Sequence, residues 1–141
     1  MVAATDGVEN VGQSARLLVV DDEPGMADLI AMHLRRERED LTVVTESTGQ
    51  AALERIAGAP SFDCVVSDYD MPTATGIELL KRLRAETSAT AFVLFTNVAS
   101  DELRRRTREL GGRYIRKESD SSTYERLVEC VLAEVTDESG P

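Results

Sequence analysis

The chain has 141 residues, which fits one domain of ordinary size with a well-buried core. Its hydrophobic fraction of 42% is typical of a soluble globular protein, and no apolar stretch approaches the roughly 20 residues that span a bilayer. The formal net charge of −10 argues against direct contact with nucleic acid, and the N-terminus has no signal-peptide pattern, so we expect a cytoplasmic protein without membrane insertion.

The chain begins with a polar, aperiodic stretch, and we interpret residues 1–15 as a flexible leader. Residues 17–20 form a short apolar run that predicts a strand. Asp22, Glu23 and Pro24 then predict a helix cap followed by a proline in the first turn. Apolar residues recur at helical spacing from Met26 to Leu34, so the first helix follows directly.

The same alternation of strand and helix recurs four more times. Strands are predicted at 41–45, 63–67, 91–95 and 113–116, and helices at 48–57, 77–85 and 101–110, with a final helix ending near Val135. Strands that are apolar throughout are buried on both faces, as in a parallel sheet covered by helices. The sequence therefore predicts a doubly wound α/β domain over residues 16–135, with a flexible tail at 136–141.

Polar side chains stand at the ends of four of the predicted strands. They are Asp21 with Asp22, Asp68, Thr96 and Lys117. Each has an ordinary structural explanation by itself, as a helix cap, a turn former, a loop hydroxyl or a solvated charge. In open α/β sheets, however, ligands bind beyond the carboxyl ends of the strands, where these side chains would meet. Their joint placement indicates a binding site.

The chemistry of this predicted site requires cations. Two carboxylates about 4 Å apart repel by roughly 4 kcal/mol at an effective dielectric constant of 20. Carboxylate and carbonyl oxygens suit an octahedral Mg²⁺ ion, which keeps positions free for water and phosphate oxygens. With Lys117 as a second cation and Thr96 as a hydrogen-bond donor, the edge suits a doubly charged phosphoryl group.

Four motifs resemble those of the response-regulator receiver family, in its CheY-like, stand-alone form. They are LLVVDDEP at 17–24, CVVSDYDMP at 64–72, LFTN at 94–97 and YIRKE at 114–118. The resemblance covers roughly residues 16 to 135 and implies a flavodoxin-like (βα)5 fold. Its central sheet would have five parallel strands in the order 2-1-3-4-5.

The resemblance also implies a role for each site residue. Asp68, four residues before the motif's proline, would be the phosphoacceptor and a metal ligand. Asp21 and Asp22 would hold Mg²⁺, Asp22 directly and Asp21 through water, and Asp70 would contribute its backbone carbonyl. Lys117 and Thr96 would contact the oxygens of the phosphoryl group. Thr96 would also act as a switch together with Tyr114.

The resemblance further implies the partners. A sensor histidine kinase or a phosphotransfer protein would supply the phosphoryl group, and an unknown downstream protein would read the changed surface. A phosphorylation-dependent dimer is compatible with this role. The chain would catalyse its own phosphorylation and dephosphorylation without being a turnover enzyme.

Three departures from the family pattern leave alternatives open. Glu118 replaces the proline that usually follows the lysine through a cis peptide, Asn97 replaces a small residue, and residues 73–75 replace a glycine-and-aspartate turn. A receiver-like module that is never phosphorylated is therefore one alternative. Another is a haloacid-dehalogenase-like phosphohydrolase, because Asp68 and Asp70 are also spaced like its nucleophile and acid/base pair.

Other residues carry weaker indications. The 14 arginines against two lysines, in an acidic chain, resemble proteins of salt-accumulating archaea and suggest a haloarchaeal source. Cys64 and Cys130 are expected to be buried thiols, and His33 a packed residue on the first helix. The helix at 101–110 has a thin apolar stripe, Leu103 and Leu110, so it is either a solvated arginine-rich face or a mobile partner surface.

Overall fold

The computed structural model describes residues 14–137, which form alternating strands and helices. The elements in chain order are β1 (Arg16–Val20), α2 (Met26–Glu37), β2 (Thr42–Glu46), α3 (Gly49–Ala57), β3 (Cys64–Ser67), α4 (Gly76–Glu86), β4 (Ala91–Thr96), α5 (Asp101–Glu109), β5 (Arg113–Arg116) and α6 (Ser122–Asp137). Every predicted strand and helix is present, with ends that differ from the prediction by a few residues.

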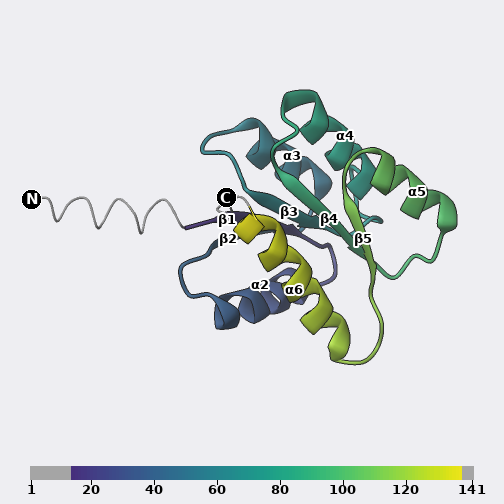
Figure 1. Ribbon diagram of the computed structural model, residues 1–141. Helices are drawn as coiled ribbons and strands as arrows, with labels where there is room; N and C mark the ends of the chain where they lie inside the picture. The colour runs from purple at the N-terminus through teal and green to yellow at the C-terminus, as the bar shows by residue number, and fades with distance from the viewer. Residues whose placement is uncertain (1–13, 138–141) are drawn as a thin grey trace, which may run out of the picture.

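The five strands form one parallel sheet in the order β2-β1-β3-β4-β5. Helices α2 and α6 cover one face of the sheet, and α3, α4 and α5 cover the other (Figure 1). Successive side chains of β1 enter different cores: Leu17 and Val19 pack toward α2 and α6, whereas Leu18 and Val20 pack toward α3 and α4. Both faces are buried, which explains the continuous apolar run and confirms the predicted doubly wound fold.

Three helices begin at hydroxyl residues that the sequence places just before them. The side chain of Thr48 accepts the N–H of Ala51 at the start of α3, and that of Ser100 accepts the N–H of Leu103 at the start of α5. Helix α4 begins with a capping box, in which Thr75 and Glu78 bond to each other's backbone N–H groups.

The predicted start of the first helix is wrong. Helix α2 begins at Met26 after Gly25, which has a φ of 81° and provides no side-chain cap. Asp21 instead accepts the backbone N–H of Glu23 at 2.9 Å, and a turn containing Pro24 precedes the helix. The acidic residues at 21–23 therefore belong to the loop beyond β1, and Asp22 is not a helix cap.

Helix α5 is anchored as thinly as predicted, by Leu103 and Leu110, with Thr107 as an additional buried residue. Its buried positions are Leu103 and Thr107, and Leu110 lies just beyond it, half-buried. The hydroxyl of Thr107 donates to the carbonyl of Leu103 at 2.7 Å, which allows a polar side chain to be fully buried there. The Arg84 guanidinium holds the carbonyl of Leu110 at 2.7 Å, so the end of α5 is tied to α4.

The predicted leader and tail lie almost entirely outside the described residues. Ala15, at the end of the predicted leader, is buried, and its carbonyl accepts the N–H of Thr42 at 2.9 Å. Helix α6 continues to Asp137, two residues beyond the predicted end of the domain. Within residues 14–137 no helix is long and apolar enough to cross a membrane.

Candidate functional site

The carboxyl ends of the central strands bring the predicted site residues together. Asp21 directly follows β1 and Asp68 directly follows β3, and these strands are paired with Val20 opposite Ser67. Thr96 is the last residue of β4, and its carbonyl accepts the N–H of Lys117 at 2.8 Å. Because the chain leaves β1 for β2 on one side while β3 lies on the other, this edge is the point where strand order reverses.

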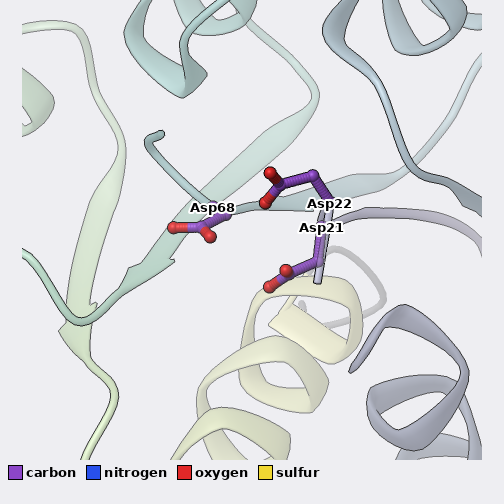
Figure 2. Close-up of side chains that lie close together, drawn as sticks. All are labelled: Asp21, Asp22 and Asp68. Atoms are coloured by element: carbon purple, nitrogen blue, oxygen red, sulfur yellow. The ribbon is translucent and has the colours of Figure 1, made fainter. Parts of the chain in front are cut away.

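Three carboxylates form a compact acidic cluster at this edge. One carboxylate oxygen from each of Asp21, Asp22 and Asp68 lies within 4.8 Å of the other two. Figure 2 shows the three carboxyl groups gathered beyond the ends of β1 and β3. The side chain of Asp21 is 1% exposed and that of Asp68 is 13% exposed, whereas Asp22 is open to solvent. The cluster is therefore a partly buried site with one open side.

Lys117 supplies the cation of the site. Its Nζ lies 2.7 Å from Oδ2 of Asp21 and 3.4 Å from Oδ2 of Asp68. Burial lowers the pKa of Lys117, but the hydrogen bond and charge of Asp21, followed by the charge of Asp68, outweigh burial and raise it. The ammonium group is therefore held in its charged form between the two carboxylates.

The surroundings of Asp21 disfavour its charged form. Burial raises its pKa above the ordinary value, and the nearby charge of Asp68 adds to this, while Lys117 and the Glu23 N–H oppose it. Three carboxylates face one ammonium, which leaves two negative charges uncompensated among these four side chains. A divalent cation would balance them.

The donor set fits Mg²⁺, because this ion prefers a few carboxylate oxygens and completes its shell with water. Asp21, Asp22 and Asp68 provide such oxygens on one open side. Asp70 is exposed, and its side chain does not belong to this cluster of three. The expected role of Asp70 uses its backbone carbonyl, and this stays a prediction.

The carboxylate of Asp68 is oriented by backbone groups around it. The Oδ1 atom of Asp68 accepts the N–H of Tyr69 at 2.7 Å, and the backbone N–H of Asp68 donates to the carbonyl of Val20 at 3.0 Å. Gly76 lies so close that a Cβ atom there would be 2.4 Å from the carbonyl oxygen of Asp68. The close contact between Gly76 and the backbone of Asp68 was not predicted from the sequence, because a glycine after a helix cap does not indicate a contact with a distant residue.

Thr96 and Tyr114 meet at a single residue of the loop after β4. The hydroxyl of Thr96, which is fully buried, accepts the N–H of Val98 at 3.3 Å. The hydroxyl of Tyr114 donates to the carbonyl of the same Val98. The ring of Tyr114 is half-buried, and its centroid lies 4.7 Å from the guanidinium carbon of Arg104 on α5.

The departures from the family pattern have different structural consequences. The cis peptide within residues 14–137 is Ala59–Pro60, so the bond between Lys117 and Glu118 is trans. Asn97 is exposed beside the site. Thr73 has a φ of 73°, unusual for a β-branched residue, and its hydroxyl accepts the N–H of Gln50 on α3 at 2.8 Å.

The remaining candidate residues lie elsewhere. His33 stacks on Tyr124 with ring centroids 4.9 Å apart, which confirms it as a packed residue. Cys64 is buried in β3 as predicted, whereas Cys130 is half-buried. Burial raises the pKa of the Cys130 thiol.

Comparisons with known proteins agree with this geometry. Residues 17–129 match the family described as the response regulator receiver domain. The probable transcriptional regulatory protein TcrX of Mycobacterium tuberculosis is 34% identical over 85 residues, which are 60% of this chain and 35% of that protein. The chain spans about a third of the length of curated relatives of this kind.

Solved structures show the same fold over most of the chain. The chemotaxis response regulator CheY4 of Vibrio cholerae superposes with a TM-score of 0.69 at 26% identity, covering 84% of this chain and 99% of that one. A CheY-like receiver domain protein from Methanospirillum hungatei gives a TM-score of 0.78 at 23% identity, covering 89% and 96%. The organisms of these similar proteins do not test the haloarchaeal source suggested by the composition, which stays a prediction.

Proposed function

This chain belongs to the response regulator receiver domain family, and from that membership we propose that Asp68 is its phosphorylated residue. The observation that supports the proposal is the position of Asp68 at the open edge, within reach of both Lys117 and the acidic pair at the end of β1. A phosphohistidine of a sensor histidine kinase or a phosphotransfer protein would be the donor, in the cytoplasm. The match to the receiver family gives no support to the phosphohydrolase alternative.

In the proposed reaction an oxygen of the Asp68 carboxylate attacks the phosphorus atom. The bond from phosphorus to the donor's imidazole nitrogen breaks as the bond from phosphorus to the Asp68 oxygen forms, and the electron pair stays on the imidazole. The Tyr69 N–H holds Oδ1 of Asp68 and so fixes the plane of the carboxylate. The chain acts as the acceptor in its own phosphorylation and is not a turnover enzyme.

Lys117 and Thr96 would stabilise the negative charge of the phosphoryl group. The ammonium of Lys117 already lies 3.4 Å from Oδ2 of Asp68, so a small movement away from Asp21 brings it onto a phosphoryl oxygen. The hydroxyl of Thr96 stands at the end of the neighbouring strand as a hydrogen-bond donor. Both groups act by positioning and by charge, which is the main contribution of proteins to phosphoryl transfer.

Asp21, Asp22 and Asp68 would hold Mg²⁺, with Asp22 as a direct ligand, Asp21 acting through water, and Asp70 offering its backbone carbonyl. The ion supplies neutralisation of the charge on the phosphoryl oxygens when it is bound. Because Asp21 is buried, bulk solvent has little access to its side of the cluster, and the electrostatic interactions there are stronger.

The output of phosphorylation is proposed to pass through Val98. If the Thr96 hydroxyl turns toward a phosphoryl oxygen, the Val98 N–H loses its partner and the loop after β4 is free to shift. The carbonyl of Val98 holds the hydroxyl of Tyr114, so the tyrosine and the overlying Arg104 of α5 would move with it. An unknown downstream protein, or a second copy in a phosphorylation-dependent dimer, would read this changed surface.

Labelling with a small phosphodonor tests the proposal. Incubation with Mg²⁺ and acetyl phosphate should add one phosphoryl group, detected by mass spectrometry of the intact chain. Asp68→Asn should abolish the label, whereas the matched control Asp70→Asn should keep it, because the side chain of Asp70 lies outside the cluster. A label that survives in Asp68→Asn and disappears in Asp70→Asn would overturn the assignment. An unlabelled parent chain would favour the alternative of a receiver-like module that is never phosphorylated.

A further inference from the structure

The hydroxyl group of Thr123 brackets Lys117 on both sides along the chain. It accepts a hydrogen bond from the backbone N–H of Glu118 at 3.2 Å and donates one to the backbone carbonyl of Arg116, also at 3.2 Å. Thr123 is 1% exposed, so bulk water has little access to the hydroxyl. One buried side chain therefore holds backbone groups immediately before and after the lysine.

The sheet alone does not provide this restraint. Strand β5 ends at Arg116, and its pairing with β4 reaches one residue farther, through the bond from the Lys117 N–H to the Thr96 carbonyl. Past Lys117 the chain leaves the sheet, and the side chains of residues 118–121 are exposed. The Glu118 N–H is held by Thr123 at this exit, where β4 no longer offers a partner.

Thr123 is itself held firmly. It lies in the first turn of α6, and its own N–H donates to the carbonyl of Asp120 at 3.3 Å. Farther along α6, Leu127 and Val131 are fully buried in the core beneath the sheet. The position of the hydroxyl is therefore set by the packing of a long helix, and its two hydrogen bonds restrain the backbone on either side of Lys117.

We infer that Thr123 is a positioning residue for Lys117, an inference that rests on the proposed function of Asp68. A lysine has a long flexible side chain, so the place of its ammonium depends on where its backbone is held. The ammonium lies 2.7 Å from Asp21 and 3.4 Å from Asp68, so it is placed where a phosphoryl group on Asp68 would be within its reach. A misplacement of about 1 Å in a reacting site can reduce a rate by about a hundredfold, so a small shift of this backbone matters.

Two substitutions of Thr123 and one control separate positioning from stability. Thr123→Val keeps the shape of the side chain and removes the hydroxyl, whereas Thr123→Ser keeps the hydroxyl. Thr90→Val is the control, because Thr90 is also buried and its hydroxyl also donates to a backbone carbonyl, that of Phe62 at 2.8 Å. Thr90 lies just before β4, at the end of that strand opposite to the site. Unfolding by urea measures the stability of each variant.

The rate of Asp68 labelling by acetyl phosphate with Mg²⁺ should fall by about ten- to a hundredfold in Thr123→Val and return in Thr123→Ser. Thr90→Val should keep the parental rate even if it loses as much stability. Hydrogen exchange at the Glu118 N–H should be slow in the parent and faster in Thr123→Val.

Parental labelling in Thr123→Val would overturn the inference and leave the proposed function standing. An unlabelled parent would overturn the proposed function, and the inference with it. If Thr123→Val does not fold, the parent chain decides: a protected Glu118 N–H supports the inference, and an unprotected one overturns it.

Discussion

Replacing Gly76 by alanine should damage both the stability of the fold and the site. A Cβ atom at this position would lie 2.4 Å from the carbonyl oxygen of Asp68 and 2.6 Å from Cδ1 of Leu94, whereas ordinary contact begins at 3.4 Å. The backbone of α4 or of Asp68 must therefore move by about 1 Å, because the carbonyl cannot rotate away as a flexible side chain could. The perturbation thus falls directly on the proposed phosphoacceptor.

The sign of the effect follows from two opposing magnitudes. Alanine in place of glycine stabilises a helix by roughly 0.5–1 kcal/mol, and this gain is smaller in the first turn. Overpacking of a well-filled core costs about 1–3 kcal/mol, and a contact with backbone favours the upper part of that range. We expect Gly76→Ala to lower the free energy of unfolding by about 2 kcal/mol.

Urea unfolding and the rate of Asp68 labelling measure the two effects separately. Gly58→Ala is the matched control, since its Cβ atom would meet backbone carbonyls at ordinary distances of 3.5 and 3.7 Å. The control should be as stable as the parent or slightly more stable, with normal labelling. If Gly76→Ala unfolds and labels like the control, the close approach of α4 to Asp68 is not as described.

Other predictions concern the charged groups and the switch. Lys117→Arg should fold and bind Mg²⁺ but not support signalling, because the planar guanidinium does not replace a compact ammonium; normal output in a reconstituted phosphotransfer assay would contradict this. The pKa of Asp21 is raised above the ordinary aspartate pKa of 3.8, so on lowering the pH its carboxylate takes up a proton at a higher pH than an ordinary aspartate does. The affinity for Mg²⁺, measured by calorimetry, should therefore begin to fall at that higher pH. With beryllofluoride as a stable phosphoryl mimic, NMR signals over residues 97–116 should shift in the parent, and Thr96→Ala should bind the mimic with much smaller shifts around Tyr114. An unchanged surface in the parent would show that the switch is absent.

The sequence by itself determined the order of the elements and the location of the site. Apolar strands such as 17–20 repeat between helical stripes, and such local periodicity depends on neighbouring residues alone. Asp21, Asp68 and Lys117 could be predicted to converge because parallel strands place their carboxyl ends at one edge of a sheet, whatever the details of packing. The family motifs then implied a role for each of these residues, and these roles stay predictions.

Local patterns were less informative where the chain turns. Asp22, Glu23 and Pro24 have the composition of a helix start, yet the carboxylate of Asp21 takes the Glu23 N–H and the helix begins only after Gly25. The competition between a cap and a loop contact is decided by the burial of Asp21 beside Lys117, and Lys117 lies 96 residues farther along the chain.

The tertiary structure alone decided which side chains support the site from outside the motifs. Thr123 is one polar residue at the start of the last predicted helix, and Gly76 is one glycine after a helix cap. Their contacts with the backbone around Lys117 and Asp68 depend on how α6 and α4 pack on the sheet. Packing at this precision follows from the shapes of many buried side chains acting together, and the spacing of residues along the sequence does not contain it.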